Sequence, residues 1–289
     1  MITHTQSKIS QQHPCFSKEA HNKFGRLHLP ISPSCNIQCR FCTRSINTTE
    51  NRPGVTATVL KPENAVETVQ KALQFCPEIT VVGIAGPGDT LATDDALQAL
   101  RAVHEVFPNL IKCLSTNGLL LPDKIDEIKE AGIQSVTVTV NAVDPVIVSQ
   151  IVSHIVWRGE ILRGIAMGQI LVARQMEGIR KLTNQGITVK VNTVLIPEIN
   201  EDHIADIAFS VREAGAVIYN IIPLIPQGEF IKLTPPNCEI LRKAKSTATQ
   251  YIEVFDHCRH CRADACGIPG VNDFARQLYG NRMETFSHG

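Results

Sequence analysis

Three cysteines stand close together near the start of the chain, where Cys35, Cys39 and Cys42 form the pattern C-x3-C-x2-C. Thiolates are soft ligands that suit zinc or iron–sulfur clusters. Structural zinc sites usually take four ligands in two pairs, and no fourth ligand stands beside these three. Three ligands on a four-iron cluster leave one iron open to a small molecule. The spacing therefore favours an iron–sulfur cluster, with a zinc site that borrows a distant ligand as the alternative.

A second group of cysteines lies near the other end of the chain, where Cys258 and Cys261 form C-x2-C in an Arg- and His-rich tail. Taken alone, this pair fits a zinc site as well as an iron–sulfur cluster. The zinc site would take its other ligands from Cys266 and from His257 or His260. The chain has ten cysteines and no secretion signal. Since a reducing compartment argues against a disulfide framework, metal binding is the favoured explanation.

Charge and composition exclude several classes of protein. The 289 residues include 28 Lys and Arg and 28 Asp and Glu, so the formal net charge is zero. A neutral chain has no strong overall attraction to nucleic acid or anionic lipid. No apolar run reaches the roughly 18 to 20 residues that span a bilayer, and the polar N-terminal segment lacks the apolar stretch of a signal peptide. We therefore expect a cytoplasmic globular protein that binds neither nucleic acid nor membrane.

Strand-like and helix-like segments alternate regularly and must position these cysteines. We expect strands at 27–32, 79–86, 110–116, 135–141, 186–196 and 216–224. We expect helices at 62–75, 94–107, 121–132, 200–215 and 238–255, and a mostly helical stretch at 144–185. Such alternation predicts an α/β fold with a parallel sheet and helices outside it. Six units are too few for a closed eight-unit barrel, so an open, partial β/α barrel is predicted. Functional residues should then lie at the C-terminal ends of its strands.

The remaining segments suggest how the chain is organised around this core. We expect an N-terminal arm at 1–25, the partial barrel at 26–230, and a C-terminal helix and tail at 231–289. The first cysteine group follows the first strand. The segment GIAGPGD at 83–89 ends the second strand, and its glycines would let the backbone approach a ligand closely, an ordinary strand-to-helix turn being the alternative. Cys76 and Cys238 fall in helical patterns and are interpreted as structural.

The C-x3-C-x2-C pattern after a first strand resembles the radical S-adenosylmethionine (SAM) superfamily, in which the open iron of a [4Fe-4S] cluster binds SAM. Phe41 matches the aromatic residue that the superfamily usually places before the third cysteine. Over most of residues 13–267 the chain is similar to the NifB family, in its form without a further C-terminal domain. The resemblance rests on HPCFSKEAH (13–21), CNIQCRFC (35–42), ENRPG (50–54), GIAGPGD (83–89), CLSTNG (113–118), TVTVN (137–141), VKVNTVLIP (189–197), NIIPL (220–224) and CRHCRADA (258–265).

The resemblance implies a SAM-dependent enzyme that makes the iron–sulfur–carbide precursor of the nitrogenase cofactor. Such an enzyme fuses two [4Fe-4S] substrate clusters and inserts a carbon from a SAM methyl group and a sulfur. It implies that Cys35, Cys39 and Cys42 hold the SAM-binding cluster, that Cys15, Cys258 and Cys261 hold one substrate cluster, and that His21 and Cys113 hold the other. Arg259 and Arg262 would offset cluster charge. The implied SAM-lining residues are Phe41, Gly86, Gly88, Asp89, Ser115, Asn117, Thr139, Asn141, Val191 and Asn192.

The sequence departs from the family at one implied ligand. The family usually has a cysteine six residues after Cys42, and here that position is Thr48. A neutral hydroxyl is a poor iron ligand, so the second substrate cluster is left with His21 and Cys113. Cys266 is a hypothetical substitute, and a weakly held cluster explains the departure equally well. Glu50 and Arg52 match the family's E-x-R-P segment, which places Glu50 near the clusters as a carrier of protons or, alternatively, in a structural ion pair.

Two other functions stay open. One is a different radical SAM enzyme with a single auxiliary cluster held by Cys15, Cys258 and Cys261, and the other is a non-catalytic iron–sulfur scaffold. The implied partners are SAM, donors of iron–sulfur clusters, downstream carrier or scaffold proteins, and a reductant such as ferredoxin or flavodoxin.

Overall fold

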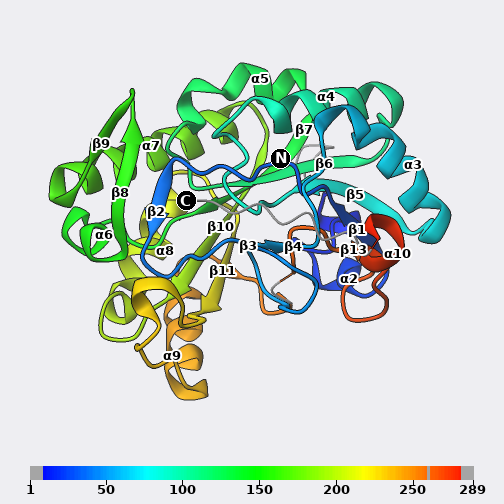
Figure 1. The fold of residues 1–289 in the computed structure, drawn as a ribbon. Coiled ribbons are helices and arrows are strands. Elements are labelled where there is room, and N and C mark those ends of the chain that lie inside the picture. Colours follow the sequence, from blue (N-terminus) through cyan, green and yellow to red (C-terminus); the bar gives the residue numbers. More distant parts are fainter. Residues whose placement is uncertain (1–8, 259–260, 281–289) are drawn as a thin grey trace.

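The computed structural model describes residues 9–258 and 261–280, and its centre is a curved sheet of eight strands (Figure 1). The strands follow the order β12-β11-β10-β7-β6-β5-β1-β13, and all neighbours are parallel except β1 and β13. Their bounds are β1 Gly25–His28, β5 Ile79–Ile84, β6 Ile111–Thr116, β7 Ile133–Thr139, β10 Thr188–Leu195, β11 Ile218–Pro223, β12 Glu253–Val254 and β13 Cys266–Gly267. The six predicted strands are thus confirmed, in spatial order equal to chain order.

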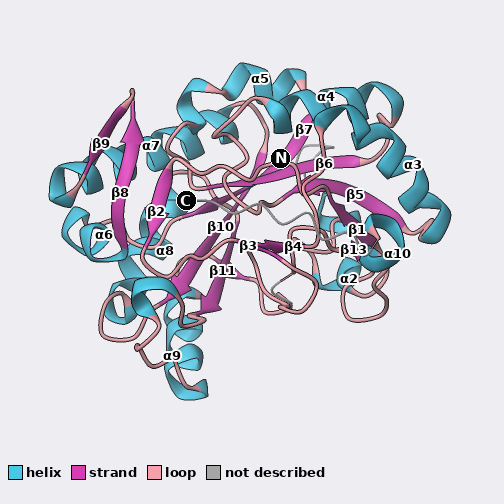
Figure 2. Ribbon diagram, viewed as in Figure 1, coloured by secondary structure: helices cyan, strands magenta, loops and turns pink. Residues whose placement is uncertain are grey.

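Helices follow the strands and cover the outer face of the sheet, as Figure 2 shows for α3, α4, α5 and α7. The two ends of the sheet do not pair with each other, so the predicted open, partial barrel is confirmed. Four short 3-10 helices, η1 to η4, lead into or join the longer elements. The bounds are α3 Ala65–Phe75, α4 Asp95–Val106, α5 Ile125–Glu130, α7 Gly164–Asn184, α8 Ile204–Glu213, α9 Cys238–Ala248, η1 Pro62–Asn64, η2 Leu121–Asp123, η3 Glu201–His203 and η4 Gly228–Phe230.

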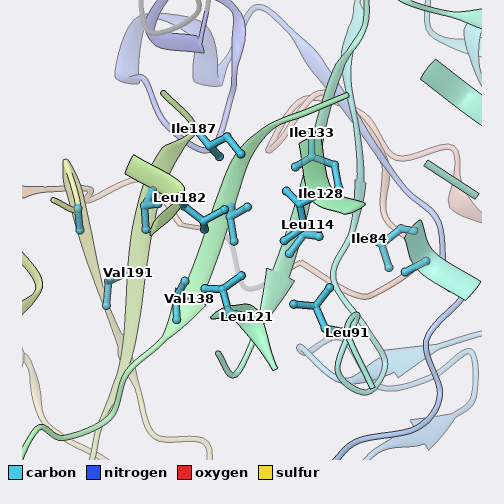
Figure 3. Packing of buried hydrophobic residues seen from close by; sticks show 14 of the residues in the cluster. Ile84, Leu91, Leu114, Leu121, Ile128, Ile133, Val138, Leu182, Ile187 and Val191 are labelled. Carbon is cyan, nitrogen blue, oxygen red and sulfur yellow. The ribbon is translucent and has the colours of Figure 1, made fainter. Parts of the chain in front are cut away.

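The main hydrophobic core lies between the sheet and these helices. Successive side chains of a strand point to opposite faces, so in β7 Val136 and Val138 enter this core while Thr137 and Thr139 face the inside of the barrel. Figure 3 shows Val138 and Val191 of neighbouring strands packed with Leu182 of α7. This alternation leaves the inner face free to carry polar and thiol side chains.

The stretch 144–185 is mostly helical, as predicted, but it is not one continuous helix. It contains α6 Pro145–Ile151 and α7, but a hairpin of β8 Val152–Trp157 and β9 Glu160–Leu162 separates them. The hairpin turns at Arg158 and Gly159, whose φ angles of 52° and 83° match the left-handed geometry of a tight two-residue turn. Its β-branched residues pair with β2 Ile37–Cys39, a strand inside the first cysteine segment. The hairpin therefore supports the cysteines directly.

The predicted helix 238–255 is also too long. It ends at Ala248, and residues 253–254 form the edge strand β12 beside β11. The tail then returns across the molecule, where β13 pairs with β1 and α10 Ala275–Tyr279 follows. The tail is thereby part of the sheet at the opposite end from α9 (Figure 1).

The N-terminal arm and the loop after Cys42 form the remaining described parts of the fold. In the N-terminal arm, residues 9–12 are helical and α2 spans Lys18–His21. The arm is tied to the sheet where Thr80 Oγ1 donates to the Gln12 carbonyl at 2.7 Å. The short strands β3 Ser45–Ile46 and β4 Val55–Thr56 pair across the loop that follows Cys42. In the part of the chain that the structure describes, no helix is long and apolar enough to cross a membrane.

Candidate functional site

A cavity at the C-terminal ends of the strands brings the first cysteine group together with the predicted SAM-lining residues. Cys35, Cys39 and Cys42 lie on its wall beside the hairpin that supports them. The predicted residues that line the same cavity are Phe41, Gly88, Asp89, Ser115, Asn117, Thr139 and Asn141. Residues at the C-terminal ends of successive parallel strands thus meet around one cavity, as expected for a parallel sheet.

The backbone of the GPGD turn fixes the start of the cysteine segment. The N–H of Gly88 donates to the Ser32 carbonyl at 2.5 Å, and the N–H of Asp89 donates to the Ser34 carbonyl at 2.8 Å. A β-carbon on Gly88 would overlap the Ser34 carbonyl, so glycine is required for this approach. The backbone that Gly88 approaches is therefore that of the residues before Cys35. Gly86 has a φ of 125°, where glycine is also favoured, and it does not itself line the cavity, although its neighbours Ala85 and Pro87 do.

Asp89 is a buried carboxylate that joins the ends of β5 and β6. It accepts hydrogen bonds from the Leu91 N–H at 3.0 Å, from Thr116 Oγ1 at 3.0 and 3.1 Å, and from the Asn117 N–H at 2.5 Å. Burial nevertheless raises the pKa of Asp89 above its ordinary value. Its negative charge lies close enough to contribute to raising the pKa values of Cys35 and Cys39.

Two amide side chains shape the cavity floor, and one of them is not apparent from the sequence. Asn117 Nδ2 donates to Asn36 Oδ1 at 2.6 Å and lies 3.8 Å from Cys35 Sγ. Gln175 of α7 donates through Nε2 to the carbonyls of Asn117 at 2.8 Å and Thr139 at 3.0 Å. Its Oε1 is buried without a hydrogen-bond partner among the described atoms. A ligand with an N–H or O–H group would satisfy that oxygen.

The three thiols fit an iron–sulfur cluster that carries SAM. Burial raises the pKa of Cys35 to about 11. Burial also raises the pKa of Cys39 well above its ordinary value, and the neighbouring thiols contribute to that rise. Without metal the thiols are protonated at neutral pH, and metal binding must release these protons. All three are free of disulfides. The cavity therefore offers three thiol ligands, an apolar wall and one amide oxygen without a partner, Gln175 Oε1.

A second cavity adjoins the first and shares Phe41, Cys42, Ser115 and Thr139 with it. Four further thiols face this second cavity, from the arm, from β6 and from the tail, namely Cys15, Cys113, Cys258 and Cys261. The topology thus gathers the cysteines that the family resemblance implies for two substrate clusters. Burial raises the pKa of Cys15 to about 11 and the pKa of Cys113 to about 12.

Gly83 makes room for one of these thiols. It pairs with Cys113 across β5 and β6, and a β-carbon on it would overlap Cys113 Sγ. A glycine in the middle of the apolar run 79–84 was the available sequence signal, because glycine weakens a strand interior unless a close approach needs it.

Basic side chains surround the second cavity, and sequence analysis did not identify the two most buried ones. Arg26 on β1 donates through Nη2 to Cys261 Sγ at 3.3 Å. Lys190 on β10 donates to the Cys15 carbonyl at 3.0 Å and lies over the rings of Phe16 and Phe255. No carboxylate of the described residues lines this cavity. The site is therefore positive and suits an anionic group such as a thiolate-bound cluster.

Arg262 does not offset cluster charge as predicted. Its guanidinium pairs with Asp264, with Nε 2.8 Å from Oδ1, and donates to the carbonyls of Asn47 and Glu50. The guanidinium of Arg262 thus links the tail to the loop after Cys42. Arg259 and His260, named in the same predictions, lie outside the described residues.

Glu50 and Arg52 form an ion pair at 2.6 Å beside the second cavity. Arg52 lines that cavity and also donates to the Thr43 carbonyl at 2.8 Å, whereas Glu50 is exposed. The hydrogen bond from Arg52 lowers the pKa of Glu50 below its ordinary value. The carboxylate is therefore ionised at neutral pH and held near the cavity mouth, and its predicted role in proton transfer stays a prediction.

Several predicted residues lie away from both cavities. Val191 is buried in the helix-side core, while its neighbour Asn192 lines the second cavity and accepts from Asn220 Nδ2 at 3.1 Å. His21 is buried beside Phe255 and His257. These positions follow from the alternation of side chains along β10 and from the separate packing of α2.

The hypothesis that Cys266 replaces the missing ligand is not supported. Cys266 pairs with Leu27 and shares its face of the sheet, where both are fully buried in the core. Cys76 lies in the same core at the end of α3, and Cys238 is an exposed first residue of α9. Within residues 9–258 and 261–280, no three His, Cys, Asp or Glu side chains meet as they would around a single metal ion.

Comparison with protein families and sequences gives consistent results. Residues 29–211 match the model of the radical SAM superfamily. The chain is 42% identical to the FeMo cofactor biosynthesis protein NifB of Methanocaldococcus infernus, over 94% of this chain and 91% of the relative. It is 46% identical to the protein of the same name from Methanocaldococcus jannaschii, over 90% and 87%. The corresponding Klebsiella pneumoniae protein is 43% identical, and the match covers 89% of this chain and 57% of that longer relative.

Solved structures show the same fold in distant proteins. Streptococcus suis SuiB bound to S-adenosylmethionine has a TM-score of 0.58 at 16% identity, over 83% of this chain and 52% of SuiB. A radical SAM methyltransferase from Sphaerobacter thermophilus has a TM-score of 0.56 at 17% identity, over 80% and 64%. These likenesses establish the architecture around the first cavity.

Proposed function

The chain belongs to the NifB family of the radical SAM superfamily, and on this premise we propose that it builds the carbide-containing precursor of the nitrogenase cofactor. It is a radical SAM enzyme of nitrogenase cofactor biosynthesis. In the proposed reaction two [4Fe-4S] substrate clusters are fused, with insertion of a carbon from a SAM methyl group and of a sulfur.

The observation that carries this proposal is the contact between two thiol-lined cavities. The first holds the three cysteines of the radical SAM pattern, and the second holds four more. Cys42 and Phe41 belong to the wall of both, so a molecule bound in the first cavity would border whatever occupies the second. A scaffold that only carries clusters would not need the first cavity at all.

The chain's own residues have distinct roles in this arrangement. Cys35, Cys39 and Cys42 would hold the [4Fe-4S] cluster, which when reduced supplies the electron that cleaves SAM into methionine and a 5′-deoxyadenosyl radical. Gln175 would orient bound SAM through its unpartnered Oε1, Asn117 fixes Asn36 beside Cys35, and the buried wall would exclude water. Cys15, Cys258 and Cys261 would hold one substrate cluster, with Arg26 and Lys190 supplying the compensating positive charge.

The proposal also names partners and a compartment. SAM is the small-molecule partner, and a ferredoxin or flavodoxin would supply electrons. Cluster donors and downstream carrier proteins would deliver substrate and accept product. We place the reaction in the cytoplasm, where a reducing environment keeps the thiols available for iron. Further [4Fe-4S] clusters beside the SAM-binding one are part of this proposal.

The test is incubation of the anaerobic, iron-loaded chain with dithionite and SAM labelled with ¹³C in its methyl group. We expect 5′-deoxyadenosine, and ¹³C in an iron–sulfur product extracted from the protein. Formation of 5′-deoxyadenosine without label in the cluster product would instead favour a different radical SAM enzyme with one auxiliary cluster. Absence of 5′-deoxyadenosine from the loaded chain would favour a scaffold. Cys35→Ala is the matched control, since it removes one ligand of the first cavity only.

A further inference from the structure

A buried histidine of the N-terminal arm, His13, lines the second cavity two residues before Cys15. The residue is 2% exposed, and its ring lies on that of Phe16 with 4.5 Å between the ring centroids. Sequence analysis gave this histidine no role. Because both nitrogens of an imidazole form hydrogen bonds, a ring buried at this place needs a partner on each edge.

One edge of the His13 ring is used within the arm itself. Its Nδ1 accepts a hydrogen bond from the Cys15 N–H at 3.1 Å. A ring nitrogen that accepts a hydrogen bond carries no proton, so the proton of this imidazole is on Nε2. The contact with Cys15 therefore fixes the tautomer and makes Nε2 a donor.

The other edge of the ring has a proton to donate and nothing described that accepts it. His13 Nε2 is buried and has no hydrogen-bond partner among the described atoms. No carboxylate of the described residues lines the cavity that His13 faces. Since buried donors in folded proteins are seldom left without an acceptor, the arrangement points to an acceptor that enters the cavity with a bound group.

The backbone of His13 keeps the ring in this position. Its N–H donates to the Ile9 carbonyl at 2.9 Å, and its carbonyl accepts from the N–H groups of Phe16 and Ser17 at 3.0 and 3.2 Å. Both backbone groups of His13 are thus satisfied inside the arm. The ring is held against the cavity by a compact turn, and its unpaired edge is a built feature of that turn.

The donor lies beside the thiols that are proposed to hold one substrate cluster. The backbone of Cys15 is fixed on both sides, by His13 Nδ1 at its N–H and by Lys190 Nζ at its carbonyl, 3.0 Å away. Cys258 and Cys261 line the same cavity and lie close enough to Cys15 to influence its ionisation. A cluster on these three thiols would therefore lie next to the His13 ring.

We propose that His13 is a positioning residue of this site, which donates a hydrogen bond from Nε2 to a sulfide of the cluster held by Cys15, Cys258 and Cys261. The proposal rests on the proposed function, because that cluster is one of its two substrate clusters. A hydrogen bond to a cluster sulfide stabilises the electron that reduction adds, so it makes the midpoint potential more positive. His13 thus orients this cluster and makes it easier to reduce.

The test uses the full chain with Cys113 and the three cysteines of the first cavity changed to alanine, which leaves the cluster of Cys15, Cys258 and Cys261. The chain is loaded with iron and sulfide anaerobically and should hold about four irons. Redox titration gives the midpoint of this cluster. Pulsed ENDOR of the reduced protein in H₂O and in D₂O detects exchangeable protons that are coupled to the cluster.

Two variants separate the donor from the contact with Cys15. In His13→Asn the side-chain oxygen can accept from the N–H two residues later, as asparagine does in an Asx-turn, but the side chain is too short to reach the cluster. In His13→Gln an amide N–H can take the place of Nε2. We expect His13→Asn to keep about four irons, to lose one exchangeable-proton coupling and to have a more negative midpoint. His13→Gln should keep the coupling and a midpoint close to that of the parent.

Equal midpoints and equal couplings in the parent and His13→Asn would overturn the proposal. Loss of the cluster from both variants would also overturn it, because the ring would then only support the fold of the arm. If His13→Asn folds poorly by circular dichroism, His13→Ser replaces it, since its hydroxyl accepts from the same N–H.

The outcome is separate from that for the proposed function. A background chain without iron, or without an exchangeable-proton coupling that depends on His13, would refute the donor. Carbide formation from labelled SAM is measured on the parent chain and does not enter this readout. A coupling that His13→Asn removes, in a protein whose parent chain makes no carbide product, would refute the proposed function and leave the hydrogen bond standing.

Discussion

Gly83 and Cys113 face each other across β5 and β6 so closely that a β-carbon on the glycine would overlap the sulfur of the cysteine. The thiol occupies space that any other residue at position 83 would fill. Because every other residue of β5 is β-branched, this one glycine reflects a requirement of the site. It keeps an opening in the inner face of the barrel next to His28.

Gly83→Ala should displace the Cys113 thiol and reduce iron binding in the second cavity. Overpacking of this kind typically costs about 1–3 kcal/mol of folding free energy. We expect a loss of about four irons per chain, measured after anaerobic loading, together with a lower urea midpoint.

The double variant Gly83→Ala, Cys113→Ala separates the two effects. Removal of the sulfur should restore most of the stability, because the added methyl group then has space, but it should not restore the iron. Restored iron in the double variant would show that Cys113 is not a ligand. Unchanged stability and iron in Gly83→Ala alone would contradict the overlap.

Gln175→Met should weaken SAM binding without removing iron from the first cavity. The substitution keeps much of the side-chain volume but deletes the two hydrogen bonds to the Asn117 and Thr139 carbonyls and the buried Oε1. Each lost bond to a buried carbonyl costs about 1–3 kcal/mol, so stability should fall as well. Calorimetric titration of the iron-loaded chain with SAM gives the affinity, and Gln185→Met on the protein surface is the control. Equal SAM affinity in the two variants would refute a ligand role for Gln175.

Arg26→Met should shift the reduction midpoint of a cluster in the second cavity to a more negative potential. Arg26 is buried, contacts Cys261 Sγ and meets no carboxylate in that cavity, so its charge stabilises added electrons. Redox titration in the chain that lacks Cys35, Cys39 and Cys42 removes the signal of the SAM-binding cluster and leaves only clusters of the second cavity. Arg26→Lys keeps the charge but loses the planar guanidinium, so it should show a smaller shift. An equal midpoint in all three proteins would contradict the electrostatic role.

The cluster-free chain should lose stability as the pH falls from about 6.5 to about 4. Burial lowers the pKa of His28 to about 4 and the pKa of His13 well below its ordinary value of 6.5. The unfolded chain therefore binds more protons than the folded chain in this window, and acid favours unfolding. For His28 alone the loss is at most about 3 kcal/mol. Urea unfolding at a series of pH values measures it, and His28→Asn should flatten the dependence. A parent curve that is already flat between these values would argue against buried neutral imidazoles.

The strand pattern and the radical SAM pattern were predictable because they are local. Continuous apolar runs such as 79–84 predict buried parallel strands, and their C-terminal ends then converge by topology. The family resemblance implied that Asn117, Thr139 and Asn141 line the SAM site, and all three line the first cavity with the three cysteines. The six alternating strand and helix units also predicted the open barrel, and the observed order of these strands in the sheet follows their order in the chain.

The positions that sequence reasoning missed depend on pairing across the sheet. The hairpin at 152–162 was missed because its strands are short and lie between two helices, although Arg158 and Gly159 form a typical tight turn. The strand register shows which groups lie opposite Arg26, Lys190 and Gly83. These contacts could not be predicted from the sequence. The hypothesis about Cys266 was wrong for the same reason, because its pairing with Leu27 directs the thiol into the core.

The most direct test of the central claim is to count iron and acid-labile sulfide per chain after anaerobic loading. The account predicts about twelve irons, about four of which disappear in the variant with Cys35, Cys39 and Cys42 changed to alanine. The same variant should yield no 5′-deoxyadenosine. About four irons in the parent, all lost in that variant, would leave the second cavity without clusters and would contradict the proposed maturation of two substrate clusters.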